Sequence, residues 1–301
     1  MRRRDFIRLI AGSAAACPVA THAQQPNERT IGYFSGRSSD AEKQYNAAFR
    51  QGLEEAAYVD GRNVRSEYRF SNGRDDLLPA IAAELARQQV AVLVATDAPS
   101  ARAAKRATTI IPIAFSAGDD PVKLGLVESL NRPGGNATGV FVFVTELGPK
   151  RLQLIRELVP HAKMIAYIVN LSSETGPPQV SVMEAAAKAM GQQILVLSAS
   201  TEKQIDEAFV TLVQRKADAI VYSASVFFQV MRDQLVTLAA RHSIPAIYEW
   251  PEFVQSGGLI SYSSTRLEPG RQMGSYAGQI LNGAKPGDLP VVQSSKFELA
   301  N

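Results

Sequence analysis

Residues able to carry acid–base or metal chemistry are few in this sequence, and none is spaced as a catalytic site. Two of the three histidines, His161 and His242, are each expected at a helix C-terminus, where a protonated imidazole is favourable. The adjacent carboxylates Asp119 and Asp120 precede Pro121, and an N-cap role is favoured because neighbouring side chains do not converge on one point. No G-x-S-x-G, H-E-x-x-H or metal-spaced cluster occurs. The sequence therefore predicts no catalytic residue, no metal site and no cofactor.

Small polar residues instead collect where the predicted strands end. Ligands of open parallel sheets bind beyond the carboxyl ends of the strands, so these loops are the candidate binding site. In the first half of the chain the candidates are Ser35, Ser38, Ser39, Thr96, Asp97, Ser100, Gly118 and Asp119. In the second half they are Asn170, Ser172, Ser223, Ser225, Glu249 and Trp250.

Structural roles compete with ligand binding at most of these positions. The loop from Ser35 to Asp40 either only caps the next helix or also grips an anionic group with its amides and hydroxyls. Asp97 either caps the helix that follows it or accepts a hydrogen bond from a ligand ammonium group, and the cap is favoured. For each aromatic residue beside the later loops, Trp250 included, core packing is favoured over contact with a ligand.

The elements that must position these loops alternate between short β-branched runs and longer amphipathic stretches, a pattern typical of parallel sheets with crossover helices. The first set has strands near 30–35, 64–70, 90–96, 111–115 and 137–143, and helices near 40–58, 75–88, 98–108 and 121–130. The second set has helices near 146–159, 177–190, 202–215, 227–242 and 266–282, and strands near 163–169, 193–197, 218–223, 245–248 and 258–262.

This alternation predicts an α/β fold of two doubly wound parallel-sheet lobes joined by a hinge. The expected divisions are an export signal at 1–23, an N-terminal lobe at 24–145 and a C-terminal lobe at 146–301, with the hinge near 144–148. Two such lobes facing each other would bring the polar loops into one cleft.

Residues 1–23 have the cationic start, the alanine-rich apolar stretch and the small-x-small ending at Ala23 of a cleaved export signal. The run from Arg3 to Arg8 resembles a twin-arginine signal. Lipidation at Cys17 is the less favoured alternative, because Pro18 follows directly. We therefore expect a periplasmic protein whose mature chain has no cysteine and no disulfide.

The composition is that of a soluble globular protein, with 46% hydrophobic and 20% charged residues. The leader holds four of the 32 basic side chains and one of the 29 acidic ones, so the remaining chain carries 28 of each and is formally neutral. Without a basic surplus, the mature chain has no obvious face for a nucleic-acid partner. No run of about 18 apolar residues is present, so no membrane-spanning helix is expected.

Several segments carry a resemblance to a known family, and the most specific is Pro133-Gly134-Gly135-Asn136-Ala137-Thr138-Gly139, which also forms a turn into the strand at 137. The others include Ile31-Gly32-Tyr33, Asp120-Pro121-Val122, Arg232-Asp233-Gln234-Leu235, Ile244-Pro245-Ala246-Ile247-Tyr248 and Gly257-Gly258-Leu259-Ile260-Ser261-Tyr262. On these segments nearly the whole chain resembles the tryptophan/tyrosine-type ABC transporter substrate-binding proteins, which are close to the leucine-binding type I periplasmic binding proteins.

The resemblance implies a non-enzymatic Venus-flytrap receptor. Such a receptor captures an amino acid or similarly small carboxylate between its lobes and delivers it to an ABC permease and, through it, to the ATPase subunit. We expect this one to be a monomer. An exported enzyme on a flavodoxin-like scaffold and a ligand sensor without transport are the alternatives.

Three departures from the family pattern bear on the ligand and the chain end. Asp97 lies where the family commonly has a glycine-rich tip, and we expect its carboxylate to change the ligand charge that the site prefers. Ser223-Ala224-Ser225 lacks the Asp-Asn of aromatic-amino-acid binders, which disfavours tryptophan as the ligand. Relatives usually run on past the equivalent of Asn301, so a shortened last lobe is expected.

Overall fold

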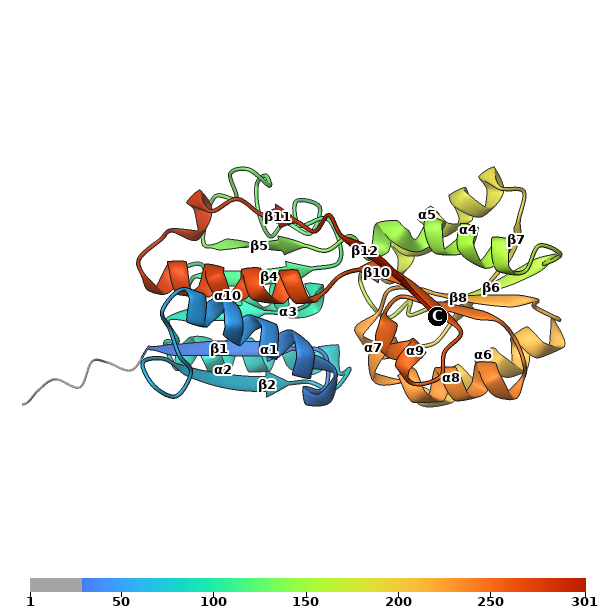
Figure 1. The fold of residues 1–301 in the computed structure, drawn as a ribbon, viewed down its shortest axis with the longest axis horizontal. Coiled ribbons are helices and arrows are strands. Elements are labelled where there is room, and N and C mark those ends of the chain that lie inside the picture. The colour runs from blue at the N-terminus through green and yellow to red at the C-terminus, as the bar shows by residue number, and fades with distance from the viewer. Residues whose placement is uncertain (1–28) are drawn as a thin grey trace, which may run out of the picture.

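The computed structural model describes residues 29–301, which form two lobes, each built on a six-stranded sheet (Figure 1). The predicted fold of two α/β lobes is therefore confirmed. The predicted signal at 1–23, with its arginine run and Cys17, lies outside the described residues. Within residues 29–301 no helix has the length and apolar character needed to cross a membrane.

The first lobe contains a parallel sheet with the strand order β11-β5-β4-β3-β1-β2. Its strands are β1 (Thr30–Ser35), β2 (Arg65–Phe70), β3 (Val92–Ala95), β4 (Ile113–Ala117), β5 (Ala137–Phe141) and β11 (Val292–Gln293). The helical segments between the early strands are α1 (Ser39–Glu55), η1 (Asp75–Leu77), α2 (Leu78–Arg87) and α3 (Ala98–Ala107). Strand β3 is buried along its whole length, as expected for a parallel strand covered on both faces.

The second lobe has the strand order β12-β10-β9-β8-β6-β7, in which β12 runs antiparallel to β10 and the other pairs are parallel. Its strands are β6 (Met164–Val169), β7 (Gln193–Ser198), β8 (Ala219–Tyr222), β9 (Ala246–Tyr248), β10 (Ile260–Ser264) and β12 (Phe297–Ala300). Its helices are η2 (Thr145–Leu147), α4 (Gly148–Leu158), α5 (Gly176–Ala189), α6 (Glu202–Gln214), α7 (Val226–Val230), α8 (Arg232–Arg241) and α9 (Pro251–Gln255).

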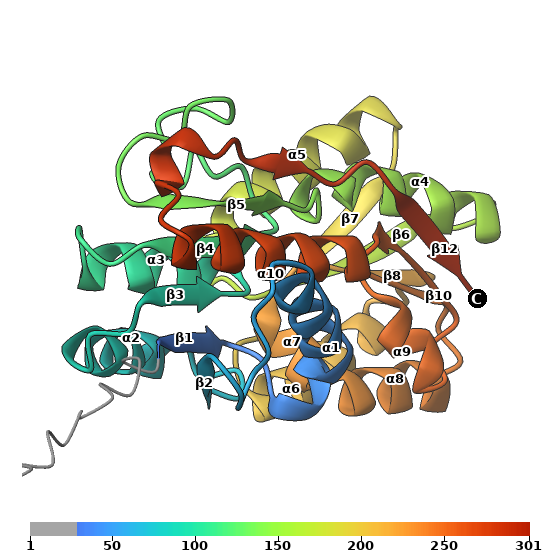
Figure 2. The ribbon, with the colours of Figure 1, turned by 60° about the vertical axis from the view of Figure 1, so that its left-hand side comes forward.

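The C-terminal segment does not stay in the second lobe, so the predicted division into 24–145 and 146–301 is wrong there. Helix α10 (Leu267–Leu281) packs against α1 of the first lobe, as Figure 2 shows, and after η3 (Pro286–Asp288) strand β11 pairs with β5. Strand β12 then returns to the second sheet. The chain therefore crosses between the lobes near 142–147, 264–267 and 293–297, and the hinge near 144–148 is one of three crossings.

Two local predictions also differ from the structure. Residues 121–130 form a series of turns instead of a helix, because Gly125 has a positive φ of 68°, outside the helical region. The predicted helix at 227–242 is divided at Met231 into α7 and α8. The other predicted helices and strands are confirmed within a few residues at each end.

Candidate ligand-binding site between the lobes

The facing ends of the two sheets enclose a cavity with about 640 Å³ of empty space, the part open to solvent included. Loops after β1, β3, β4 and β5 line one side of it, and loops after β6, β8 and β9 line the other. The cavity therefore lies beyond the carboxyl ends of the strands in both lobes, as the sequence predicts.

Seven of the fourteen predicted site residues line this cavity, namely Thr96, Asp97, Gly118, Asp119, Ser225, Glu249 and Trp250. The other seven lie outside its lining, namely Ser35, Ser38, Ser39, Ser100, Asn170, Ser172 and Ser223. Side chains of the second group mainly form hydrogen bonds with nearby backbone groups. The Ser38 hydroxyl accepts from the amide of Ala41 at the start of α1, and the Asn170 side chain accepts from the amide of Ser172.

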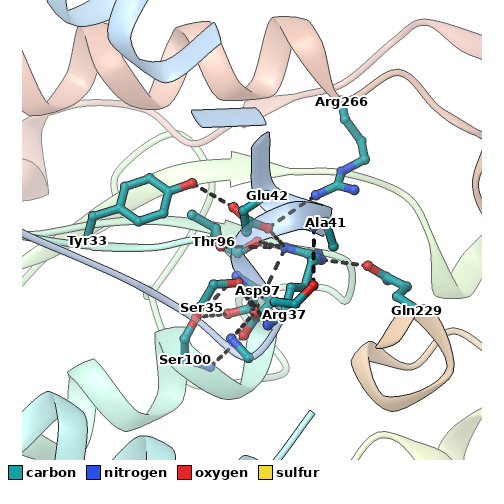
Figure 3. Close-up of polar contacts among 12 residues, drawn as sticks. Tyr33, Ser35, Arg37, Ala41, Glu42, Thr96, Asp97, Ser100, Gln229 and Arg266 are labelled. Atoms are coloured by element: carbon teal, nitrogen blue, oxygen red, sulfur yellow. Dashed lines mark hydrogen bonds and ion pairs between the residues drawn. The ribbon is translucent and has the colours of Figure 1, made fainter. Parts of the chain in front are cut away.

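Asp97 is the N-cap of α3, which confirms the favoured interpretation of this residue. Its Oδ1 accepts from the amide of Ser100 at 2.9 Å, and its Oδ2 accepts from the hydroxyl of Ser35 at 3.0 Å and the amide of Gly36 at 2.7 Å (Figure 3). Two donors of the first loop, the Ser35 hydroxyl and the Gly36 amide, are thus occupied by the protein's own carboxylate.

A buried ion pair lies behind this loop. The Nη1 of Arg37 donates to Glu42 Oε1 at 2.8 Å and to the carbonyl of Thr96 at 2.9 Å. The hydroxyl of Tyr33 donates to the other oxygen of Glu42 at 2.6 Å. Burial alone would lower the pKa of Arg37, but the carboxylates of Glu42 and Asp97 raise it overall, so the guanidinium remains charged.

Arg37 also connects the two lobes. Its Nε donates to Gln229 Oε1 on α7 at 2.6 Å, and Gln229 Nε2 donates to Glu249 Oε1 at 2.8 Å (Figure 3 labels the first pair). The second oxygen of Glu249, Oε2, is buried and has no hydrogen-bond partner within the described part of the chain. Burial raises the pKa of Glu249 to about 7, against the opposing effect of Arg151.

Arg266, in the crossing before α10, makes the second connection between the lobes. Its guanidinium bonds to Glu42 of the first lobe at 3.3 Å and to Glu252 of the second at 3.1 Å. It also lies over the rings of Tyr45 and Trp250, 5.4 and 5.0 Å from their centroids. At the rim, Arg102 and Arg106 of α3 pair with Glu174 of the second lobe. The lobes are thus held closed by direct contacts.

Two further carboxylates of the first lobe line the cavity. Burial raises the pKa of Asp75 to about 6, with a further increase from Asp97, and Asp75 Oδ1 has no hydrogen-bond partner among the described residues. Burial also raises the pKa of Asp119, although its Oδ1 accepts from the hydroxyl of Thr145 at 2.6 Å. Across residues 29–301, no cluster of three or more histidine, cysteine and acidic side chains is arranged to hold a metal.

Several cavity residues were missed in the sequence analysis. Arg37 lies inside a loop that the sequence does flag, but its serines were selected instead of its arginine. Gln229 is on a helix, and Arg266 reaches the cavity only because α10 returns to the first lobe. The candidate residues were chosen because they follow predicted strands. This criterion does not detect residues on the segments that cross between the lobes.

Two parallel-sheet lobes closed over a polar cavity define a bilobal receptor of the type I periplasmic-binding-protein fold. The chain belongs to the family of ABC transporter substrate binding proteins, whose model matches residues 35–300. It is a substrate-binding protein of that family.

Particular relatives are similar over nearly the whole chain. A tyrosine-binding protein of Clostridioides difficile (strain R20291) is 27% identical over 317 residues, covering 99% of this chain and 90% of that protein. The structure of an ABC domain in complex with L-Trp from Streptococcus pneumonia has a TM-score of 0.81 at 24% identity, covering 90% and 91% of the two chains. The ligand-free, open structure of a substrate-binding protein with adhesive properties from Clostridium difficile has a TM-score of 0.63 at 26% identity, with the same coverage.

Proposed function

We propose that this protein captures an amino acid or a similarly small carboxylate in the inter-lobe cavity and delivers it to the permease of an ABC importer. The observation that carries the proposal is a pair of buried groups in the cavity wall that have no partner among the described residues. Glu249 Oε2 is a free acceptor suited to a ligand ammonium group, and Trp250 Nε1 is a free donor suited to a carboxylate. The names of the tyrosine-binding and L-Trp-bound relatives support the same ligand class.

Capture depends on a ligand that binds the closed form better than the open form. The contacts of Arg37 with Gln229 and of Arg266 with Glu42 and Glu252 exist only when the lobes approach each other. A ligand that occupies the free groups of Glu249 and Trp250 adds contacts to this closed arrangement. Closure then presents one joint surface of both lobes to the permease.

The proposed site of action is the periplasm, reached through the cleaved signal predicted at 1–23. Sequencing the N-terminus of protein recovered from a periplasmic extract tests this directly. A chain beginning at Gln24 is expected, and an intact Met1 in the cytoplasmic fraction would contradict export.

A thermal-shift screen tests the binding function. The chain from Gln24 is unfolded and refolded to remove bound solute, and is then screened against amino acids, other small carboxylates, sugars and nucleosides. A ligand at 100 times its dissociation constant stabilises the folded state by about 2.7 kcal/mol, which raises the midpoint by several degrees. A selective rise with an amino acid or small carboxylate is expected. An unfolding midpoint that rises only with sugars or nucleosides would contradict the proposed ligand class.

A further inference from the structure

We infer that the cavity selects a basic amino acid, with Asp75 of the first lobe holding the side-chain cation of the ligand and Glu249 of the second lobe holding its α-ammonium group. This inference rests on the proposed function and narrows it to one charge class. It is carried by the charge balance of the cavity and by the free oxygens of two carboxylates on opposite walls.

The charge balance of the cavity is negative. Four carboxylates line it, those of Asp75, Asp97, Asp119 and Glu249, against the two arginines Arg37 and Arg266. Both arginines are already paired with protein carboxylates, Arg37 with Glu42 and Arg266 with both Glu42 and Glu252. Arg37 also lies 3.9 Å from Asp97 Oδ2 and so partly balances that carboxylate. Within residues 29–301 no ion pair is formed by Asp75, Asp119 or Glu249, and a ligand of net positive charge is therefore favoured.

The net charge of the cavity remains negative when the nearby charged groups are included. Arg151 acts on Glu249, and Arg102 acts on Asp75 and Asp119, but Arg102 is itself paired with Glu174. Arg106 also pairs with Glu174, so the cavity and its immediate partners hold seven carboxylates and five arginines, a formal excess of two negative charges when all of them are ionised. A neutral amino acid would leave this excess uncompensated in a partly desolvated site, where charge interactions are stronger than in water.

Asp75 and Asp97 form the acidic wall of the first lobe. A methyl group placed on Gly36 would lie 3.2 Å from Asp97 Oδ2 and 3.5 Å from Asp75 Oδ1, so the two carboxylates flank the same point of the chain. Asp97 already accepts from two backbone amides and a hydroxyl, whereas Asp75 Oδ1 accepts from no described residue. Burial and, after it, repulsion from Asp97 raise the pKa of Asp75, and a cation beside Asp75 would relieve that repulsion.

Glu249 provides the second proposed contact with the ligand, from the opposite wall of the cavity. Its side chain is 1% exposed, and one carboxylate oxygen is held by Gln229 while the other has no donor within residues 29–301. An unpaired buried carboxylate oxygen is costly, and an ammonium group removes that cost most effectively. Trp250 adjoins Glu249 in the sequence, and its free indole N–H leaves a donor for the ligand carboxylate.

The test compares lysine with norleucine, which differs from it at the end of the side chain by lacking the ε-ammonium group. Binding of each to the ligand-stripped chain is measured by isothermal titration calorimetry. We expect lysine or arginine to bind about 30-fold or more tightly than norleucine, as expected for a desolvated charge pair. Tryptophan and tyrosine are included as neutral aromatic competitors.

Two variants test which group of the ligand each carboxylate binds. Asp75→Asn is expected to remove most of the preference for lysine, because lysine loses its charge partner while norleucine, which leaves Asp75 uncompensated in the wild type, binds as tightly as before or more tightly. Glu249→Gln is expected to weaken lysine and norleucine together, because both carry the α-ammonium group. The matched control is Asp76→Asn, since Asp76 is the exposed neighbour of Asp75 and pairs with Arg74 at the surface. Asp76→Asn is expected to bind like the wild type, and circular dichroism verifies that each variant folds.

The outcomes separate this inference from the function on which it rests. Equal or tighter binding of norleucine, tryptophan or tyrosine, with no effect of Asp75→Asn, would overturn the charge selection and leave an amino-acid receptor in place. A folded protein that binds no amino acid of any charge would overturn the proposed function itself. Lysine selectivity that Asp75→Asn does not reduce would overturn the role of Asp75.

Discussion

At the scale of single residues, Glu249 links ligand recognition to stability. Its carboxyl group is buried. One of its oxygens accepts a hydrogen bond from Gln229, and the other has no donor among the described residues. Burial raises its pKa from the ordinary 4.5 to about 7. Between these two pH values the folded protein holds a proton that the unfolded chain has already released, so this group makes stability fall as the pH rises from about 4.5 to about 7.

Replacing Glu249 with Gln should therefore have a pH-dependent effect on the ligand-free protein. Glutamine mimics the protonated carboxyl group and still accepts from Gln229. We expect Glu249→Gln and the wild type to be equally stable near pH 5, and the variant to be more stable at pH 8 by up to about 3 kcal/mol. Urea titrations at both pH values measure this difference. Parallel stability curves for the two proteins would contradict a raised pKa.

Asp97 illustrates a predicted site residue whose main role is structural. Replacing it with Ala removes the cap of α3 and leaves the Ser35 hydroxyl and the Gly36 amide without their acceptor. We expect a loss of about 2–4 kcal/mol in unfolding free energy, measured with urea. Thr201→Ala is the control, because Thr201 caps the exposed start of α6 and its loss should cost only about 1 kcal/mol. Equal costs for the two substitutions would show that the Asp97 network adds nothing to a simple cap.

How far the site could be predicted follows from these residues. Glu249, Trp250 and Asp97 line the cavity because they follow strands, and strand ends can be read from hydrophobic patterning. The sequence does not distinguish a serine that faces the cavity from one that caps a helix, because both occur at the same positions, as Ser225 and Ser38 show. Arg266 depends on a tertiary contact between segments more than 200 residues apart, which local patterns do not encode.

At the scale of elements, the packing of α10 on α1 determines the architecture of the first lobe. The helices meet at glycines: a methyl group on Gly52 would lie 1.8 Å from the carbonyl oxygen of Arg271, and one on Gly274 would lie 2.0 Å from that of Phe49. Only a residue without a side chain allows the backbones to approach this closely. Helical periodicity predicts α10 correctly, but its partner depends on this close fit, so the sequence pattern alone assigns the helix to the wrong lobe.

Gly274→Ala tests the close helix contact. The added methyl group must push α1 and α10 apart, and we expect a loss of about 2–3 kcal/mol or more in unfolding free energy. Gln51→Ala is the control on α1, because Gln51 is the exposed neighbour of Gly52. Thermal unfolding of both variants measures the difference. A Gly274→Ala protein as stable as Gln51→Ala would contradict the packing.

At the scale of the whole molecule, closure depends on the segments that cross between the lobes. Arg151 of α4 is fully buried and donates to the carbonyl of Val144 in the first crossing and to that of Tyr262 in β10, close to the second. This side chain fixes two crossings to the second lobe. Arg266, beside the second crossing, then joins Glu42 and Glu252 across the lobes.

Removing the Arg266 connection should favour the open form. We expect Arg266→Met to bind ligand about tenfold or more weakly, because part of the binding energy must then restore closure. Arg271→Met is the control on the adjoining helix α10, since Arg271 is exposed and pairs with Glu55 within the first lobe. Calorimetric titration and small-angle scattering compare the two variants. Equal affinities and equal radii of gyration would contradict a role of Arg266 in closure.

Binding of an amino acid in the cavity between the lobes can be observed directly. Trp250 is the only tryptophan of the chain and lies in the cavity wall, so its fluorescence reports on the site directly. The decisive measurement is a fluorescence titration of the ligand-stripped protein with the amino acids that raise its unfolding midpoint. We expect a saturable change in the Trp250 emission, with the same dissociation constant as calorimetry. Ligand binding seen by calorimetry without any change at Trp250 would place the ligand outside this cavity.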